Sequence, residues 1–336
     1  MNILFTCAGR RTYLLKYFRE QLSGNGLIIG ADMQLTAPAL SAADIKVCVP
    51  SVYAENYVDK LWEICNEYDV NLIVSLNDLE LPILAKNKPL FESKKITVLV
   101  SSEDVIDICF DKYKTFRYIT SIGLKSPETF IHLDEAVVAL KSGLLKFPLV
   151  LKPRWGSGSI GVETVYDEEE LSAVYSLLQK RIKRTILSTV SQKDSACILI
   201  QQKIIGDEYG LDVINNLCGE HVTVVVKKKL AMRAGETDKA ETVDSPEIFQ
   251  IGETIGTNLK HIGNLDCDIL EEDGKYYVLE MNPRFGGGFP FSYEAGVNLP
   301  KAIIDWADGR TVDNIILKPK IGKIYSKCDC LVDVTV

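Results

Sequence analysis

Residues 279–288 read LEMNPRFGGG, and this short run says more about the fold than any other part of the chain. It follows apolar and aromatic residues at 276–278, which predict a strand. Side chains two positions apart on a strand face the same side, so Glu280 and Asn282 would project together from its end. A carboxylate beside an amide oxygen is a hard ligand pair of the kind that Mg²⁺ takes next to nucleotide phosphates. The run therefore predicts a magnesium site.

The rest of the run suits an anionic ligand. Pro283 ends the hydrogen-bond ladder of the strand, and Arg284 supplies a fork-shaped cation for a phosphate or a carboxylate. Glycines at 286–288 let the backbone approach a ligand closely. A strand that simply ends in a polar turn explains any one of these residues, but it explains their order less well.

A second signal is the segment LVLKPRWGSGSIGV at residues 149–162. Its glycine pattern, G-x-G-x-x-G, leads into a helix in dinucleotide-binding proteins. Here residues 162–165 predict a second strand, so the segment favours a hairpin flap whose N–H groups close over phosphates. Lys152, near the end of the first strand, would bring a cation to the same place. A plain surface hairpin is the alternative.

A third signal, QQKIIGDEY at residues 201–209, crosses from one predicted strand to the next. Its backbone could meet the edge of a base, and Glu208 could accept hydrogen bonds from a ribose. A plain connection between strands explains this segment equally well when it is taken alone. Together with the flap and the acidic strand, the segment supports a role in binding a base and a ribose.

Composition indicates a folded soluble protein with room for about two domains. The 336 residues are 46% hydrophobic and 25% charged, and the net charge of −8 disfavours a nucleic-acid surface, which needs a clustered basic face. No apolar run approaches the ~20 residues of a membrane span, and the N-terminus lacks a signal-peptide pattern. Nine cysteines, mostly single and in apolar segments, suit reduced thiols, so we expect a cytoplasmic protein without a membrane partner.

The first 105 residues alternate short apolar runs with helical patterns. Strands are predicted at 2–7, 27–31, 46–49, 72–75 and 97–100, and helices at 12–22, 56–68 and 78–86. This alternation predicts an α/β arrangement with a parallel sheet. Ligands of such sheets bind beyond the carboxyl ends of the strands, so Arg10, Asp78 and Glu80 are candidates for contacts with an anionic substrate.

A dinucleotide site in this part is a weaker alternative. Asp32 follows the turn at Gly9 by about twenty residues, as the ribose-binding acid of such a site would. The turn has one glycine where the fingerprint needs three, and Arg10 and Arg11 follow it.

The rest of the chain predicts an α+β unit. Helices are predicted at 111–121, 134–142, 168–178 and 246–259, and strands at 148–152, 161–165, 197–202, 209–214, 222–229, 265–270 and 275–281. The polar segment 230–240 is expected to be a loop between a strand and a helix. The tail from residue 318 predicts strands that complete a lobe or form a dimer contact.

These clusters, in this order and spacing, resemble the ATP-grasp superfamily, and within it the carbamoyl-phosphate-synthase-like branch that includes biotin carboxylase and small-molecule carboxylate–amine ligases. The resemblance covers nearly the whole chain. It implies a Rossmann-like pre-ATP-grasp domain at 1–105 and a two-lobed ATP-grasp domain at 106–336. Within the latter it implies a lid at about 125–195 and a metal-binding lobe at about 196–312.

The resemblance also implies roles for single residues. The ATP phosphates would meet Lys112, Lys152 and the flap residues Gly156, Ser157, Gly158, Ser159 and Gly161. The base and the ribose would meet Gln202, Lys203, Ile204 and Glu208. Relatives usually have a glutamate where this chain has Gln202, which leaves the base selectivity less defined.

The same resemblance assigns the metal and the substrate. Two Mg²⁺ ions, with Mn²⁺ as an alternative, would bind Asp268, Glu280 and Asn282. Asp266 faces the same way as Asp268, so either aspartate could be the first ligand. Arg284 would hold the transferred phosphoryl group. Arg233 and Lys239, in the polar segment, would bind the substrate.

The implied activity is an ADP-forming ligase in which Lys152, Glu280 and Arg284 act on ATP and a small carboxylic acid, which is coupled to an amine through an acyl phosphate. One alternative is a phosphotransferase or carbamoyl-phosphate-forming enzyme on the same ATP site. Another is a nucleotide-binding protein without catalysis. The acid, the amine and the oligomeric state are left open, with a homodimer as one option.

Overall fold

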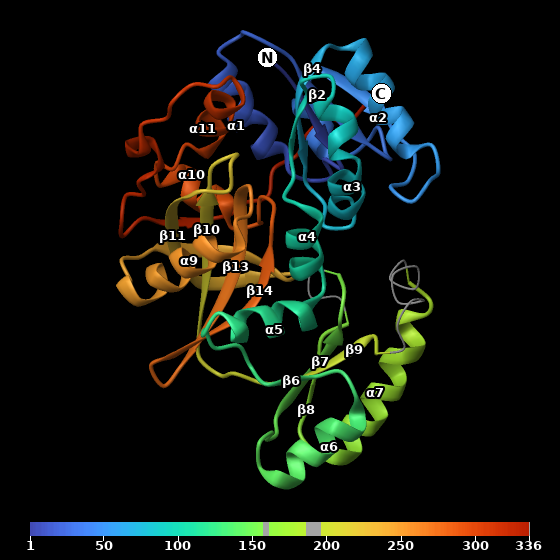
Figure 1. The fold of residues 1–336 in the computed structure, drawn as a ribbon, viewed down its shortest axis with the longest axis vertical. Helices are drawn as coiled ribbons and strands as arrows, with labels where there is room; N and C mark the ends of the chain where they lie inside the picture. Colours follow the sequence, from blue (N-terminus) through green and yellow to red (C-terminus); the bar gives the residue numbers. More distant parts are fainter. Residues whose placement is uncertain (157–160, 186–195, 336) are drawn as a thin grey trace.

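The computed structural model describes residues 1–156, 161–185 and 196–335 (Figure 1). It contains three sheets, which correspond to an N-terminal domain, a lid and an acidic lobe. Among the described residues, none of the helices combines the length and the apolar character needed to cross a bilayer.

The N-terminal domain is built on a five-stranded parallel sheet, as predicted. Its strands, in the spatial order β3-β2-β1-β4-β5, are β1 (Asn2–Thr6), β2 (Ile28–Asp32), β3 (Ile45–Cys48), β4 (Val70–Ser75) and β5 (Thr97–Leu99). Successive side chains of a strand alternate between faces. Ile3 and Phe5 therefore pack with helix α1 (Thr12–Leu22), whereas Leu4 packs on the other face with α2 (Tyr57–Glu67) and α3 (Leu81–Glu92).

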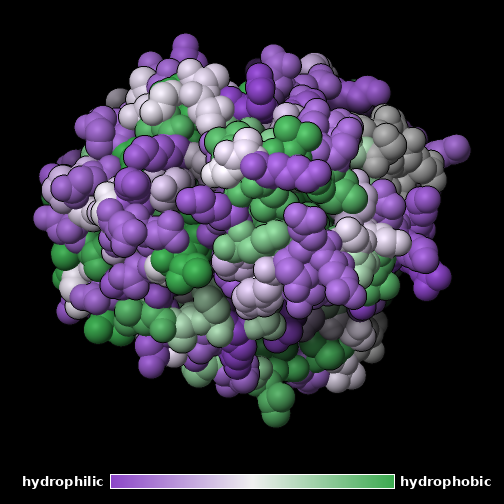
Figure 2. Space-filling view, turned by 90° about the horizontal axis from the view of Figure 1, so that it is seen from below, coloured by the Kyte–Doolittle hydropathy of each residue, from purple (hydrophilic) through white to green (hydrophobic). Residues whose placement is uncertain are grey.

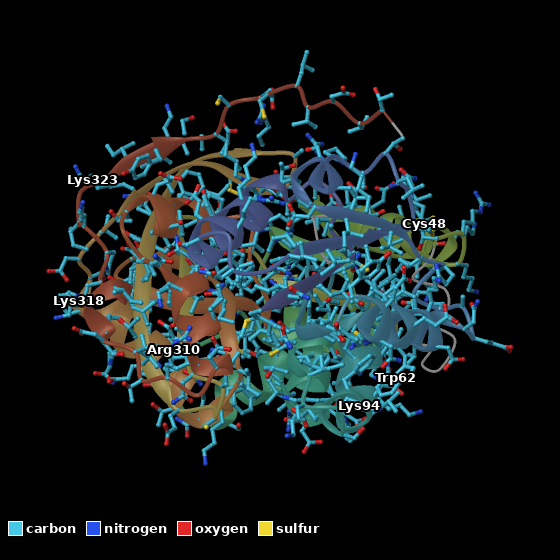
Figure 3. The ribbon with its side chains drawn as sticks, turned by 90° about the horizontal axis from the view of Figure 1, so that it is seen from above. Cys48, Trp62, Lys94, Arg310, Lys318 and Lys323 are labelled. Atoms are coloured by element: carbon cyan, nitrogen blue, oxygen red, sulfur yellow. The ribbon has the colours of Figure 1, made fainter. Side chains whose placement is uncertain are left out.

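The two sides of this domain differ in what covers them. Figure 3 looks down on the domain and shows Trp62 of α2 beside Lys94, whose Nζ lies 6.0 Å from the indole ring. The C-terminal residues Lys318 and Lys323 lie on the opposite side of the molecule. Helix α1 packs against α11, whereas α3 packs against α4.

Helices α4 (Glu103–Phe110) and α5 (Lys112–Ser121) lead to the lid. The lid sheet has the order β6-β9-β7-β8, with β6 (Thr129–Phe130), β7 (Leu149–Pro153), β8 (Glu163–Val165) and β9 (Ile198–Gln202). Helices α6 (Leu133–Ser142) and α7 (Glu168–Ile182) cover it and share a separate apolar core with it. From the lid end, hydrophobic residues are interspersed with hydrophilic ones on the surface (Figure 2). Since β9 belongs to this sheet, the lid extends beyond the expected end at residue 195.

The acidic lobe is a six-stranded sheet in the order β14-β13-β10-β11-β12-β15. Its elements are β10 (Asp207–Asn215), β11 (His221–Arg233), β12 (Glu236–Thr242), α9 (Pro246–Leu259), β13 (Gly263–Glu272), β14 (Lys275–Asn282), α10 (Phe289–Glu294), α11 (Leu299–Ala307) and β15 (Ile324–Ser326). The expected loop at 230–240 is wrong, because β11 and β12 form a hairpin there. The tail pairs with β12 through β15 and completes the lobe.

The N-terminal domain and the acidic lobe share one apolar core. Phe18 of α1 packs edge-on against Phe285, with 6.0 Å between ring centroids, and Phe285 packs against Phe289 of α10 at 4.7 Å. Tyr17 stacks on Tyr293 at 3.6 Å. Figure 1 shows α1 beside α11 and the lid at the far end of the molecule.

Candidate active site

A cavity of about 560 Å³ lies between the lid sheet and the acidic hairpin β13–β14. Most of the residues predicted to bind ATP line it, namely Lys112, Lys152, Gly156, Gln202, Lys203, Ile204, Glu208, Asp268 and Glu280. The predicted flap residues Ser157, Gly158 and Ser159 lie outside the described residues. Gly161 resumes the chain with φ of +72°, and a Cβ there would lie 3.2 Å from Pro153.

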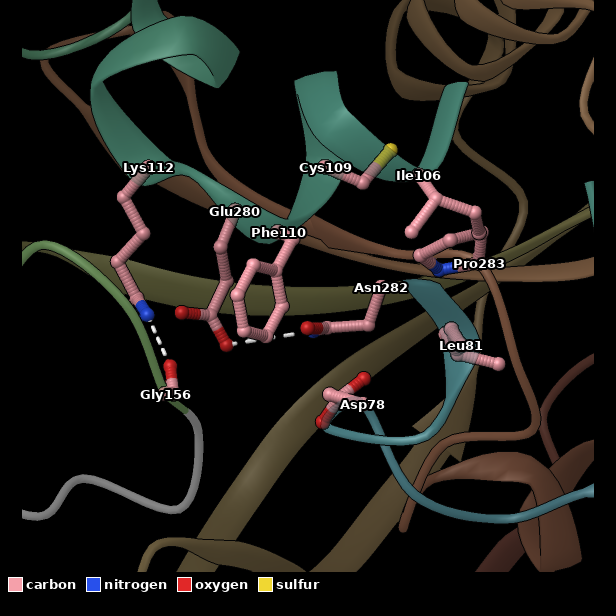
Figure 4. Close-up of a pocket in the computed structure, with 10 residues that line it drawn as sticks. All are labelled: Asp78, Leu81, Ile106, Cys109, Phe110, Lys112, Gly156, Glu280, Asn282 and Pro283. Atoms are coloured by element: carbon pink, nitrogen blue, oxygen red, sulfur yellow. Dashed lines mark hydrogen bonds between the residues drawn. The ribbon is translucent and has the colours of Figure 1, made fainter. Parts of the chain in front are cut away.

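Two lysines approach the acidic hairpin from the opposite side of the cavity. Lys112 opens α5, and its Nζ donates to the carbonyl oxygen of Gly156 (Figure 4). Lys152 is buried on β7, and burial lowers its pKa to about 8, while the nearby Glu280 opposes this shift and Lys112 adds to it. Both lysines therefore provide cationic groups at the place expected for phosphates.

A buried ion pair between Asp111 and Arg154 fixes the backbone around these lysines. Asp111 caps α5 by accepting from the amide of Tyr113 at 3.0 Å, and Arg154 donates to both of its carboxylate oxygens at 2.8 and 2.7 Å. The pair joins the start of α5 to the end of β7. Neither residue was given a role from the sequence, because the two are 43 positions apart and nothing local predicts their pairing.

The C-terminal end of β9 forms the part of the cavity where the nucleobase of ATP is expected to bind. Gln202 Oε1 accepts from the Lys146 amide at 3.0 Å, and its Nε2 donates to the Lys203 carbonyl at 3.1 Å. The Lys203 amide donates to the Pro148 carbonyl at 3.3 Å. A base would thus meet backbone groups of residue 203 that already take part in internal hydrogen bonds.

The two acids expected for the ribose and the metal are joined by a lysine that sequence reasoning did not single out. Lys229 Nζ lies 2.7 Å from Glu208 Oε1 and 2.7 Å from Asp268 Oδ1. Burial alone would lower the pKa of Lys229, but the charges of Asp268 and Glu208 raise it above its usual value. The signal in the sequence was the run Lys227-Lys228-Lys229 on a predicted strand.

The predicted metal ligands are neighbours across the hairpin. Asp268 pairs with Glu280 and Asp266 with Asn282 in the β13–β14 register, and Asn282 Nδ2 donates to Glu280 Oε1 at 3.4 Å (Figure 4). The pKa of Asp268 is raised to about 7, chiefly by burial and also by Asp266 and Glu280, while Lys229 opposes the shift. This concentration of half-buried acids suits a divalent cation.

The acids are not already assembled as a metal cage. Within the described residues, no three Asp, Glu, His or Cys side chains are grouped closely enough to hold an ion. The predicted set consists of two carboxylates and an amide, and one oxygen of Asp268 is paired with Lys229. Asp268 lines the large cavity together with Glu280, whereas Asp266 is paired with Arg284 at 2.9 Å. Both aspartates line the smaller cavity described below, and both are ion-paired.

Arg284 is held between two aspartates. Its guanidinium donates to Asp78 Oδ2 at 3.0 Å and to Asp266 Oδ2 at 2.9 Å, so it bridges the N-terminal domain and the hairpin. Burial would lower the pKa of Arg284, but Asp78 and Asp266 raise it far above its usual range. Asp78, expected to contact substrate, orients Arg284 and also lines the large cavity.

A second cavity, of about 120 Å³, adjoins the first and shares Asp268 and Glu280 with it. Its other polar lining residues are Arg11, Lys227, Lys229, Glu236, Thr237, Asp266, Asn282 and Arg284. The hairpin β11–β12 contributes Met232 and Gly235 to both cavities. The polar segment 230–240 thus lines the smaller cavity, but Arg233 and Lys239 are not among its lining residues.

Four predicted substrate residues are not brought to either cavity. Arg10 is exposed, and its neighbour Arg11 lines the smaller cavity instead. Arg233 pairs with Asp238 and Asp329 at the surface, and Lys239 is exposed. These placements depend on which face of a turn or a hairpin each side chain occupies.

Glu80 is the fourth, and it supports the N-terminal domain from within. It has no exposed surface and accepts hydrogen bonds from Thr6 at 2.7 Å, Ser75 at 2.6 Å and Tyr57. Burial raises its pKa, and these hydroxyl groups oppose the shift. The carboxylate therefore ties β1, β4 and α2 together.

Asp32 has a structural role as well. Its carboxylate accepts from the Gly9 amide at 2.9 Å and from the Gln34 amide at 3.0 Å. Gly9 adopts φ of +53°, which suits glycine. The acid that could have bound a ribose thus stabilises the turn after β1, and this weakens the dinucleotide alternative.

Comparison with known families supports the resemblance seen in the sequence. Residues 3–99 match the model of the PylC-like N-terminal domain, and residues 194–324 match the model described as ATP-grasp in the biosynthetic pathway with Ter operon. The carbamoyl phosphate synthase large chain of Clostridium beijerinckii is 24% identical over 216 residues, or 60% of this chain. This chain spans only 18% of that relative's length.

Solved structures share the fold. A biotin carboxylase from Campylobacter jejuni in complex with β,γ-ATP aligns with a TM-score of 0.74 and 16% identity, over 95% of this chain and 73% of its own. An L-amino acid ligase from Bacillus licheniformis aligns with a TM-score of 0.71 and 19% identity, over 96% and 78%. The predicted arrangement of a pre-ATP-grasp domain followed by a two-lobed ATP-grasp domain is confirmed.

Proposed function

We propose that this chain, which has the ATP-grasp fold, is an ADP-forming ligase that couples a small carboxylic acid to an amine. The observation that carries the proposal is the junction of the two cavities at Asp268 and Glu280. The larger cavity lies between two lysines and the acidic hairpin, as a nucleoside triphosphate requires. The smaller one has space for a small polar substrate on the far side of the same acids.

Asp268, Glu280 and Asn282 would hold two Mg²⁺ ions, or Mn²⁺ in their place. The bound metal neutralises the charge of the phosphates and helps to orient them. Among the residues of the chain, Lys112 and Lys152 place positive charge on the lid side of the cavity, where it reduces the repulsion between the triphosphate and an incoming carboxylate.

The reaction we propose has two steps. A carboxylate oxygen of the substrate attacks the γ-phosphorus, the bond to the bridging β–γ oxygen breaks, and ADP leaves with that electron pair. The amine nitrogen then attacks the acyl carbon, loses a proton and displaces inorganic phosphate. Arg284, positioned by Asp78 and Asp266, would hold the phosphoryl group between these steps.

The smaller cavity limits the substrates by size and charge. It combines cationic side chains, such as Arg11 and Lys227, with acidic ones, such as Glu236. A volume of about 120 Å³ is suited to a small polar molecule. We therefore expect small charged acids and amines to be substrates and bulky apolar ones to be excluded.

Release of ADP across a set of small acids and amines tests the proposal. Turnover should require both substrates and should be lost in Glu280→Gln. Asp273→Asn, at the exposed turn of the same hairpin, is the matched control and should remain active. Phosphate retained in the product would favour a phosphotransferase, and ATP affinity without any turnover would favour a nucleotide-binding role.

A further inference from the structure

Lys229 makes a contact that spans three strands. It lies on β11, and the order β13-β10-β11 places β10 between it and Asp268 on β13. Its ammonium group is nevertheless 2.7 Å from Asp268 Oδ1, and also 2.7 Å from Glu208 Oε1 on β10. Neighbouring strands are ~4.8 Å apart, so the side chain crosses the full width of β10.

Gly210 opens the path for this side chain. It pairs with Asp268 on one side and with Lys227 on the other. A Cβ at this position would lie 3.2 Å from Lys229 Cε and 3.8 Å from Asp268 Oδ1. Glycine weakens the middle of a strand and often marks a close approach of another group. Here the close approach is the stem of Lys229.

The contact is partly shielded from water. The side chain of Lys229 is 6% exposed, whereas those of Glu208 and Asp268 are 29% and 20% exposed. Asp266 and Glu280 add further negative charge around Asp268. Charges in such surroundings interact more strongly than in water, and a buried acid that loses its counter-ion is costly. Without nucleotide, the ammonium group of Lys229 thus offsets charge at both acids.

We propose that Lys229 is an internal counter-ion that prevents divalent cations from binding to the acidic hairpin until a nucleotide is present. This rests on the ATP site proposed above. The ammonium group occupies the neighbourhood of the Asp268 oxygen that a metal would need, and two like charges at one oxygen repel each other. A bound triphosphate adds enough negative charge to accommodate both cations. Lys229 is therefore a positioning residue that acts through Asp268 and Glu208.

Binding of Mn²⁺ to the full-length chain without nucleotide, measured by electron paramagnetic resonance of free Mn²⁺, tests this inference. We expect Lys229→Met to bind Mn²⁺ about tenfold more tightly than the wild type, within the range of ordinary coupling between two sites. Lys229→Gln removes the same charge but keeps a hydrogen-bond donor, so it covers the case in which the methionine variant does not fold. A nonhydrolysable ATP analogue should bring the wild type to the affinity of the variants.

Lys228→Met is the matched control. Lys228 is the adjacent residue and pairs with Asp207 at 2.5 Å, but its side chain is 32% exposed and it lines neither cavity. It should bind Mn²⁺ like the wild type. In thermal unfolding, Mn²⁺ alone should stabilise the Lys229 variants and leave the wild type and the Lys228 variant unchanged.

Equal Mn²⁺ affinity of the wild type and the Lys229 variants without nucleotide would overturn this inference, and so would an equal gain in Lys228→Met. In both cases, Mn²⁺ binding that depends on the ATP analogue would leave the proposed function intact. If the analogue produced no Mn²⁺ binding in any of these proteins, the proposed ATP site would fail, and the inference with it.

Discussion

The two walls of the large cavity are built differently. The acidic hairpin belongs to the acidic lobe, and its apolar residues, such as Cys267 and Met281, share one core with helices α4, α5 and α9. The lid wall, which carries Lys152, has its own core around Leu151 and Leu171. The acids and Lys152 are therefore held by two different apolar cores. The position of the acids and the position of Lys152 can thus be perturbed by separate substitutions.

Phe18→Ala tests whether the N-terminal domain and the acidic lobe form one unit, and it should have the largest effect. Phe18 is fully buried and contacts Phe5 and Phe285. Its removal should lower the free energy of unfolding by about 3–5 kcal/mol. Hydrogen exchange should become faster in the N-terminal sheet and in α10 and α11 together. Faster exchange in the N-terminal sheet alone would show that the two parts do not form one unit.

Glu280→Gln tests the role of the acidic hairpin in the proposed reaction. The substitution removes one negative charge from the hairpin with little change in shape. We expect kcat for ADP release to fall about 10²–10³-fold, the usual result when one preorganised electrostatic group is lost. Steady-state kinetics checks this, with circular dichroism as the control for folding. A kcat within twofold of the wild type would remove Glu280 from the proposed mechanism.

Leu171→Ala tests the independence of the lid. Leu171 is 1% exposed on α7 and packs in the lid core. Its truncation should destabilise the lid by about 2 kcal/mol, the lower end for such substitutions, because the lid core is small. Hydrogen exchange should become faster in β6–β9 while β13–β14 stays protected. Equal acceleration in both regions would contradict the proposed separation.

Gln202→Ala should have the smallest effect. Gln202 Oε1 and Nε2 hold the backbone near Lys146 and Lys203, where we expect the base to bind. Loss of these hydrogen bonds should weaken ATP binding by about 1 kcal/mol, or roughly fivefold. Calorimetry with ATP and GTP measures both affinity and selectivity. An unchanged preference and an unchanged affinity would place the base elsewhere.

Local patterns were sufficient to predict most of the elements. Helix α9 covers Pro246–Leu259, which is the range predicted from the sequence. The hairpin of β13 and β14 and the five strands of the N-terminal sheet were also predicted. These elements have apolar periodicity within their own residues, so neighbouring sequence is enough to predict them.

Long-range contacts could not be predicted in the same way. β12 is polar and was expected to be a loop, and it is a strand because β11 and β15 pair with its two edges. Asp78 and Arg284 are 206 positions apart, and nothing local predicts their ion pair. Asp78 and Glu80 were both expected to contact the substrate. Asp78 lies beside Arg284, whereas Glu80 is buried at the start of α3.

Calorimetric titration of the wild-type protein with ATP tests the central claim that the acidic hairpin and the lid lysines form one metal-dependent ATP site. The account predicts saturable ATP binding in the presence of Mg²⁺. This binding should be strongly weakened by a chelator and by Lys152→Met. No binding, or binding of equal strength with Mg²⁺ and with a chelator, would contradict it.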